Sequence, residues 1–181
     1  MEDVFPQQEN VDYTQMRMTP EGLYSVTRRR DGQRVIQFLA RTVPDIGRRT
    51  ITDATACVGS DTLRFSQVFQ KVHSIELKRD NVVALRNNVN VFGATNVTVY
   101  EGDATKVIKW KTDVLYIDPP WGGPDYYTKQ KLDVYISNYR LDKWIEELLK
   151  DKNRPAYVVL KLPRNYNFAH LHFLPNVIET L

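Results

Sequence analysis

The 181-residue sequence predicts a doubly wound α/β domain built on a mostly parallel sheet. From about residue 50 onward, short runs rich in β-branched residues alternate with segments whose apolar residues recur at helical spacing. The predicted strands are almost continuously apolar, as is typical of parallel strands that are covered on both faces. The length suits a single domain. The hydrophobic share of 42% and the charged share of 26% are those of a soluble globular protein.

The elements follow in a regular order along the chain. Five strands are expected, at residues 49–54, 72–77, 97–100, 113–118 and 156–162. Helices are expected between them, at residues 61–70, 80–92 and 141–150. Gly93 is a stop signal for the second of these helices, and Pro119 with Pro120 ends the fourth strand.

The two ends of the chain differ from this regular core. A further helix is expected over residues 25–41, with Ser25 or Thr27 as its cap. Residues 1–18 are expected to form a partly disordered N-terminal extension, which leaves 19–181 as the domain. Residues 177–181 resemble the first part of a sixth strand, so we expect an incomplete C-terminal end of the sheet.

Composition excludes several classes of protein. No apolar run approaches the ~20 residues of a membrane helix, and the acidic N-terminus lacks the apolar core of a signal peptide. Cys57 is the single cysteine, which excludes an internal disulfide or a cysteine-cluster zinc site. We therefore expect an intracellular protein, without membrane or metal. The net charge of +3 is unevenly spread, because residues 28–49 hold seven arginines. Such a stretch binds a polyanion or forms a solvated helix face.

Acidic residues stand where four of the predicted strands end. Asp53 closes the first strand, Glu76 ends the second, Asp103 follows the third and Asp118 ends the fourth. The carboxyl ends of parallel strands meet at one edge of the sheet, where ligands bind in folds of this class. Each acid alone could cap a helix or bond to a strand end. Together they predict a ligand site, in which Glu76 is placed to bind ribose hydroxyls.

The loop after the first strand argues against a dinucleotide. It holds a single glycine, Gly59, whereas a pyrophosphate is bound by a glycine-rich turn at a helix N-terminus. Asp53, which precedes this loop, and Asp61, which lies in it, would repel a pyrophosphate. They suit a cationic ligand with an amino-acid tail, such as S-adenosylmethionine.

The run Asp118-Pro119-Pro120-Trp121 carries the most specific chemistry. A carboxylate and a backbone carbonyl held by two stiff prolines can accept both hydrogens of an exocyclic amine, which frees its lone pair for methylation. The aromatic residue that follows can stack on the base. The alternative is a strand stop followed by a core tryptophan.

This run, continued by residues 122–126, resembles the signature of the trimethylguanosine synthases, which are cap-specific guanine-N2 methyltransferases. Residues 22–27 and 162–165 are similar to two further segments of that family, so the resemblance covers roughly residues 20–170. It implies a Rossmann-like class I fold that uses S-adenosylmethionine. The implied partner is 7-methylguanosine-capped RNA or a cap nucleotide, in the nucleus or cytoplasm of the cell or host cell.

The resemblance also implies roles for individual residues. The catalytic residues would be Asp118 and Pro119, which orient the guanine amine. The cofactor residues would be Asp53, Thr55, Gly59, Asp61, Thr62, Glu76 and Asp103. The substrate-binding residues would be Pro120, Trp121, Ser25, Thr27, Arg164 and Asn165. Among these, Trp121 would stack on the 7-methylguanine, and Ser25, Arg164 and Asn165 would hold the cap phosphates.

Several residues depart from the family pattern. Cys57 and Ser60 stand where the family usually has glycine, and Asp118 stands where its cellular members often have serine. These departures indicate a truncated or divergent member, for example a viral one. Cys57 is expected to be a packing residue, and His170 with His172 lacks a third metal ligand. Two alternatives stay open. One is an adenine-N6 or guanine-N2 methyltransferase acting on other RNA or DNA, and the other is a non-catalytic cap- or RNA-binding module.

Overall fold

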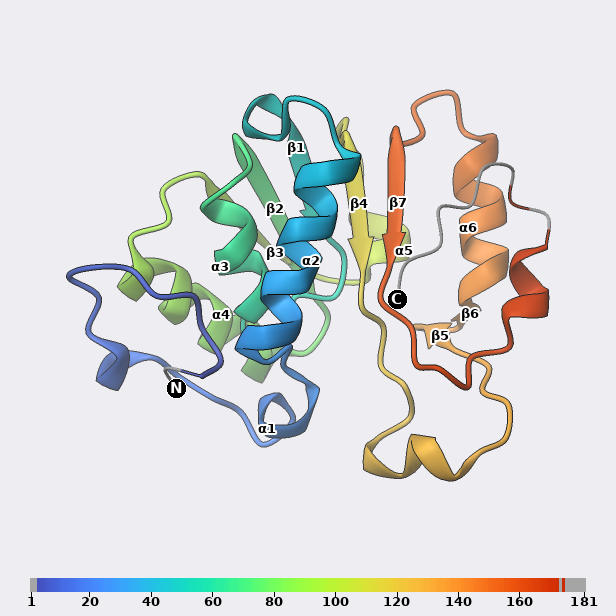
Figure 1. Cartoon of the computed structure of the whole chain (residues 1–181), viewed down its shortest axis with the longest axis horizontal. Coiled ribbons are helices and arrows are strands. Elements are labelled where there is room, and N and C mark those ends of the chain that lie inside the picture. Colours follow the sequence, from blue (N-terminus) through green and yellow to red (C-terminus); the bar gives the residue numbers. More distant parts are fainter. Residues whose placement is uncertain (1–2, 173, 175–181) are drawn as a thin grey trace.

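The computed structural model describes residues 3–172 and 174, and its centre is a five-stranded parallel sheet (Figure 1). The strands are β1 (Thr50–Asp53), β2 (Lys71–Glu76), β3 (Val97–Glu101), β4 (Val114–Ile117) and β7 (Tyr157–Leu160). Their order is β3-β2-β1-β4-β7, and every pairing is parallel. The predicted fold class is confirmed, because each expected strand is present within two residues of its predicted ends.

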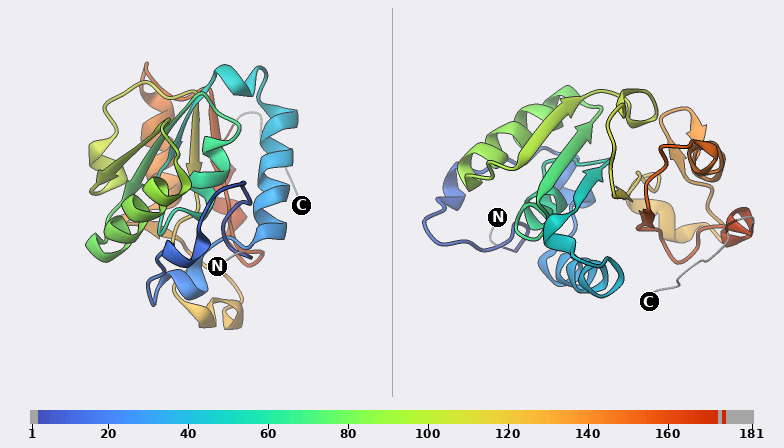
Figure 2. Two further views of the ribbon diagram at one scale, coloured as in Figure 1. Left: turned by 90° about the vertical axis from the view of Figure 1, so that its left-hand side faces the viewer. Right: turned by 90° about the horizontal axis from the view of Figure 1, so that it is seen from above.

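Helices cover both faces of this sheet. The helices are α1 (Gly22–Ser25), α2 (Arg29–Thr42), α3 (Ser60–Ser66), α4 (Arg79–Phe92), α5 (Ala104–Val107) and α6 (Leu141–Lys150). In Figure 1, α2 lies in front of the sheet and α5 behind it, and the view from above in Figure 2 agrees. Apolar side chains of α2 and α3 pack on one face, and those of α5 and α6 pack on the other. None of the helices in the described ranges is long and apolar enough to cross a membrane.

The helix expected over residues 25–41 begins later than predicted. The chain turns briefly into α1, then runs extended through Val26 and Arg28, and α2 starts only at Arg29. Neither Ser25 nor Thr27 caps α2. The reason is tertiary, because the Thr27 hydroxyl is buried and donates to Asp61 of α3. A side chain that is bound elsewhere cannot serve as the cap of its own helix.

The other helices are closer to expectation. α6 has its predicted bounds, and α4 differs from its own by one residue. Gly93 ends α4 in the left-handed conformation, with φ of 70°, which glycine adopts without steric cost. The helix predicted over 61–70 is shorter and ends at Ser66. A small antiparallel hairpin, β5 (Tyr135–Ile136) with β6 (Tyr139–Arg140), was not expected.

The segment before α1 packs against the helices. Phe5 is fully buried and Met16 is 5% exposed, in a cluster with apolar residues of α3 and α4. The boundary of the domain at residue 18 stays a prediction. The expected sixth strand at 177–181 lies outside the described residues.

Asn88 of α4 fastens this N-terminal segment. Its side chain is fully buried, and its Oδ1 accepts from the Arg17 amide at 2.7 Å. Its Nδ2 donates to the carbonyls of Arg17 at 2.9 Å and Val58 at 2.8 Å. One side chain therefore ties the N-terminal segment to the loop after β1.

We expect Asn88→Ala to lower the free energy of unfolding by about 2–4 kcal/mol, because it leaves buried backbone groups without partners. Proteolysis within residues 3–18 should become faster. Asn87→Ala is the matched control, because Asn87 donates to the Gln15 carbonyl of the same segment from a more exposed position. Urea denaturation and limited proteolysis would measure both effects. Equal losses in the two variants would contradict this role for Asn88.

Candidate active site

A cavity of about 700 Å³ opens at the carboxyl ends of β1, β2 and β4. Many of the predicted site residues line it, namely Ser25, Thr27, Asp53, Thr55, Asp61, Glu76, Asp118, Pro119, Pro120 and Trp121. The parallel topology explains the convergence of the residues at and after β1, β2 and β4, because the ends of these strands meet at one edge. Ser25 and Thr27 come from the segment between α1 and α2. Lys161, which directly follows β7, also lines the cavity and was not predicted from the sequence.

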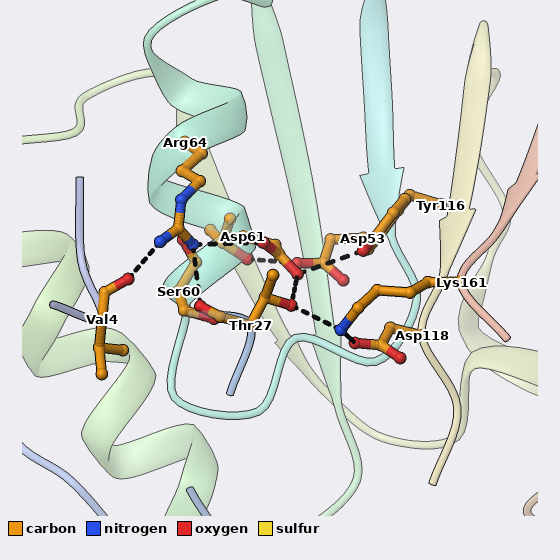
Figure 3. A network of polar contacts seen from close by, with 10 residues as sticks. Val4, Thr27, Asp53, Ser60, Asp61, Arg64, Tyr116, Asp118 and Lys161 are labelled. Atoms are coloured by element: carbon orange, nitrogen blue, oxygen red, sulfur yellow. Dashed lines mark hydrogen bonds and ion pairs between the residues drawn. The ribbon is translucent and has the colours of Figure 1, made fainter. Parts of the chain in front are cut away.

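A chain of polar contacts runs along the wall of this cavity (Figure 3). Arg64 of α3 contacts Asp61 Oδ1 at 3.3 Å, and the Thr27 hydroxyl donates to Asp61 Oδ2 at 2.5 Å. The Lys161 ammonium donates to Thr27 Oγ1 at 2.9 Å and to Asp118 Oδ2 at 2.6 Å. Thr27 therefore joins the ion pair within α3 to the ion pair between the residues that follow β4 and β7.

The Arg64 guanidinium is a buried charge, and both of its terminal nitrogens have partners. It is 4% exposed, and it also donates to the carbonyls of Ser60 and Val4. Gly32 of α2 makes room for it, because a Cβ at that position would lie 2.3 Å from Arg64 Nε. Burial lowers the pKa of Arg64, although the charge of Asp61 opposes that shift. Arg64 therefore holds Asp61 in place and brings α2 against α3.

Asp53 is the most deeply buried acid of the site. The Thr62 hydroxyl donates to its Oδ2 at 2.7 Å, and the Thr55 amide lies 3.4 Å from its Oδ1. Burial raises the pKa of Asp53 to about 8, and the nearby charge of Asp61 adds to this, while the hydrogen bond from Thr62 opposes it. At neutral pH Asp53 is therefore mostly a neutral acid that braces the loop after β1.

Glu76 presents a fixed carboxylate to the cavity. The Cys57 amide donates to its Oε2 at 2.8 Å, and the Lys78 amide donates to its Oε1 at 2.7 Å. Burial raises the pKa of Glu76, while these two hydrogen bonds oppose the shift. Each oxygen keeps accepting capacity beyond its one backbone bond. Such a carboxylate can accept from two neighbouring hydroxyl groups.

Cys57 explains how a loop with one glycine makes this turn. Its φ of 49° is left-handed, a conformation that favours glycine. The hydrogen bond from the Cys57 amide to Glu76 helps to offset the strain of this backbone conformation. Burial raises the pKa of the Cys57 thiol to about 12, and Glu76 adds to the shift. The thiol is therefore protonated at neutral pH and is a weak nucleophile.

Asp118, the first residue of the motif that follows β4, forms an ion pair with Lys161. Burial raises the pKa of Asp118 to about 6, the charge of Lys161 opposes this, and the charge of Asp61 adds to it. Burial acts to lower the pKa of Lys161, but the charges of Asp118 and Asp61 outweigh it and raise the pKa. A sequence signal for Lys161 existed, since it is the first polar residue after the apolar run 157–160.

Trp121 lies beside this pair. The Lys161 ammonium is 5.4 Å from the centroid of its ring, and the Tyr126 ring meets it edge-on at 5.0 Å. Its Nε1 is buried and has no partner in the described part of the chain. Asn165 supports this arrangement, because its amide donates to the carbonyls of Tyr126 and Lys129, each at 2.8 Å. Its side chain holds the loop that positions Tyr126.

The remaining predicted residues lie around the cavity and are not part of its lining. Asp103 caps α5 by accepting from the Thr105 amide at 3.0 Å. Gly59 begins α3 with φ of 96°, and a Cβ there would lie 2.6 Å from a Leu85 methyl group. Thr62 reaches the site through Asp53. Arg164 is exposed. The ligand roles of these residues stay predictions.

The donor set of the cavity fits S-adenosylmethionine. Carboxyl groups outnumber cations in the lining of the cavity. The acids are Glu21, Asp31, Asp53, Asp61, Glu76 and Asp118, and the cations are Arg28, Lys78 and Lys161. A cationic ligand with hydroxyl groups suits this wall, whereas a pyrophosphate would meet repulsion. Among residues 3–172 and 174, no group of three or more His, Cys, Asp or Glu side chains is arranged to hold a metal ion.

The parallel sheet with a cavity at its carboxyl edge is a Rossmann-like fold. A solved precorrin-6y methyltransferase of Geobacter metallireducens shares the fold, with a TM-score of 0.58 and 16% identity over 82% of this chain and 69% of that one. Residues 48–180 match the sequence profile of the RNA cap guanine-N2 methyltransferases. The chain belongs to this family.

The chain is also similar to curated proteins. The chain is 30% identical to trimethylguanosine synthase of Schizosaccharomyces pombe over 158 residues, which cover 82% of this chain and 63% of that protein. It is 25% identical to trimethylguanosine synthase of Saccharomyces cerevisiae over 170 residues, covering 89% and 52%. An uncharacterised protein of Acanthamoeba polyphaga mimivirus is 35% identical over 124 residues, covering 66% and 48%. The chain thus spans about half to two thirds of these relatives.

The raised pKa of Asp53 predicts a pH-dependent stability. The native state holds the proton more tightly than the unfolded chain, so this contribution is fully present below about pH 4 and is lost as the pH rises through about 8. Asp53→Asn keeps the shape of the neutral acid but cannot ionise. The wild type should therefore lose stability relative to Asp53→Asn between pH 5 and pH 9, as measured by urea denaturation.

Asp142→Asn is the control for that measurement. Burial opposes the shift, but the hydrogen bonds and charge of Arg140 lower the pKa of Asp142, so its contribution is lost only in acid. The difference between wild type and Asp142→Asn should stay flat over the same range. A flat difference for Asp53→Asn as well would show that Asp53 is ionised in the native state at neutral pH.

Proposed function

We propose that this chain transfers a methyl group from S-adenosylmethionine to the exocyclic N2 of 7-methylguanosine at the 5' cap of RNA. Family membership supports the reaction class. The observation that carries the proposal is that Asp118, Pro119 and Trp121 line the same cavity as Glu76. A motif suited to orienting an amine therefore faces a carboxylate suited to a ribose.

Glu76 and the loop braced by Asp53 would hold the methyl donor. Both Glu76 oxygens are fixed by backbone amides, so the carboxylate is already oriented for a pair of ribose hydroxyls. S-adenosylmethionine supplies an electrophilic methyl group on a positively charged sulfur. The surplus of carboxylates around the cavity favours that charge.

Asp118 and the Pro119 carbonyl would accept the two hydrogens of the guanine amine. The amine lone pair is then less conjugated with the ring and is available for the methyl group. Lys161 engages Oδ2 of Asp118, and its charge favours the ionised form that can accept a hydrogen bond. As positive charge develops on the amine nitrogen, the Asp118 carboxylate stabilises it.

Trp121 would stack on the methylated base. The 7-methylguanine ring carries a delocalised positive charge, and the face of tryptophan attracts cations more strongly than the faces of the other aromatic side chains do. Tyr126 supports the indole from its edge, and Asn165 holds the loop that carries Tyr126. The stacking surface is therefore braced before the substrate enters.

The direct test is mass analysis of 7-methylguanosine diphosphate after incubation with the protein and S-adenosylmethionine. One or two added methyl groups are expected. Turnover of guanosine or adenosine nucleotides in place of the cap analogue would favour the second candidate, an amino-methyltransferase for other bases, which Asp118 also fits. Absence of S-adenosylmethionine binding by calorimetry would instead indicate a non-catalytic module.

Asp118→Ala should lower kcat on the order of a hundredfold, with a smaller change in KM, because its carboxylate acts mainly in the transition state. In the wild type, the rate should rise with pH through about 6 as Asp118 loses its proton. Lys161→Met should move this rise to higher pH, because the opposing cation is removed. Initial rates of methyl transfer, measured across pH, would give the kcat of Asp118→Ala and the pH profiles of the wild type and of Lys161→Met. A wild-type profile without the acid limb would show that Asp118 does not titrate in this reaction.

Trp121 discriminates a cap substrate from an ordinary guanine. The wild type should bind 7-methylguanosine diphosphate at least roughly tenfold more tightly than guanosine diphosphate, since a desolvated cation–π contact adds up to ~2 kcal/mol. Trp121→Ala should weaken both ligands and shrink that ratio, whereas Trp121→Phe should keep part of it. Fluorescence or calorimetric titration gives the ratios, with melting curves as the control. An unchanged ratio in Trp121→Ala would exclude stacking by Trp121.

A further inference from the structure

Arginines form a stripe along the outer face of α2. At 3.6 residues per turn, Arg30, Arg34 and Arg41 fall within about 40° of one another around the helix axis. Gly32 and Leu39, which are buried, lie on the opposite side. The arginine side chains are exposed. We call these three residues the arginine stripe.

The charge of the stripe is largely unneutralised. Arg30 has no side-chain partner in the described part of the chain. Arg34 lies 3.5 Å from Asp31, but both side chains are more than half exposed, so this pair is weak. Arg41 bonds only to the Gln37 carbonyl of its own helix, which leaves its charge free. A free row of guanidinium groups is suited to bind successive phosphates.

The N-terminal end of the stripe is within two residues of the lining of the cavity. Arg28 immediately precedes α2 and lines the cavity with Ser25 and Thr27. In Figure 1, α2 leads from the end of the sheet where α1 lies toward the opposite end, with one side unoccupied by other elements. Arg30 and Arg41 are separated by about 16 Å along the helix axis. This equals roughly five stacked nucleotides at ~3.4 Å each.

We propose that the arginine stripe binds the sugar-phosphate backbone of the RNA that follows the cap. The inference rests on the proposed function, because it takes capped RNA as the substrate. Phosphate contacts of this kind position a nucleic acid and carry no sequence information. The stripe therefore selects RNA chains over free cap nucleotides, without preference for their sequence.

The test compares single-stranded capped RNAs of increasing length with 7-methylguanosine diphosphate. The variant is Arg30→Glu, Arg34→Glu and Arg41→Glu combined, which changes exposed residues outside the cavity. The control combines Lys143→Glu, Lys150→Glu and Lys152→Glu, which makes the same change of net charge on and after α6. Melting curves confirm that each protein is folded. Anisotropy titrations from about 50 to 200 mM salt give affinities and salt slopes.

In the wild type and the control, affinity should rise at least tenfold with RNA length and level off at about five to six nucleotides. The stripe variant should lose this gain, and its slope of log affinity against log salt should fall by about two, since each single-strand phosphate contributes ~0.7. Affinity for 7-methylguanosine diphosphate should be equal in all three proteins. An unchanged length dependence in the stripe variant, or an equal loss in the control, would overturn the proposal and leave α2 as a solvated face.

This result is separable from a failure of the proposed function. If 7-methylguanosine diphosphate were neither bound nor methylated, uncapped RNAs of the same lengths would still report on the stripe. Their salt slope should differ between the wild type and the stripe variant. Equal slopes for uncapped RNA would reject the stripe whatever the outcome at the cavity.

Discussion

The carboxyl groups of Asp53, Asp61 and Asp118 lie close together at one end of the sheet. Burying three acids in one place costs free energy, and the rest of the site compensates for that cost. Asp61 pairs with Arg64, Asp118 pairs with Lys161, and Asp53 keeps its proton at neutral pH. Each solution needs another part of the fold. Arg64 fits because α2 has a glycine beside it, and Lys161 reaches Asp118 because β7 pairs with β4. A buried carboxylate without a cationic partner would destabilise the fold by several kcal/mol. The electrostatics of three acids therefore fixes the positions of two helices and an edge strand.

Local pattern was enough to predict most of the secondary structure. The strands are short apolar runs bounded by polar residues, and α4 and α6 have a clear apolar face, so their bounds follow from periodicity. The start of α2 could not be predicted in this way, because Thr27 is a good cap that is bound instead by Asp61, 34 residues further along the chain. The hairpin of β5 and β6 has strands of two residues, too short for any periodicity to show. Tertiary partners decide both cases.

The acids of the site could be predicted because parallel topology brings strand ends together, whatever the details of packing. The cations were not predicted, because a buried Lys or Arg is recognised mainly by its partner, and the local signals for Lys161 and Arg64 are weaker than acids at the ends of successive strands. Asp61 and Arg64 are three residues apart in a helix, which was a usable signal. Asn165 shows the opposite case. The sequence predicts that it holds a cap phosphate, which stays a prediction. Its amide donates to the carbonyls of Tyr126 and Lys129, a contact across more than 30 residues that no local pattern contains.

The bond between Thr27 and Lys161 joins residues that are 134 positions apart. Contacts of such separation form late in folding, because closing so long a loop costs entropy before any contact compensates for it. During synthesis from the N-terminus, the strands that carry Asp53, Glu76 and Asp118 leave the ribosome before β7 does. Without β7, Asp118 has no cation beside it, because its partner Lys161 directly follows that strand. The ion pair of Asp118 with Lys161 is therefore complete only when the last strand of the described sheet docks, so that the proposed site and the fold are completed in the same step.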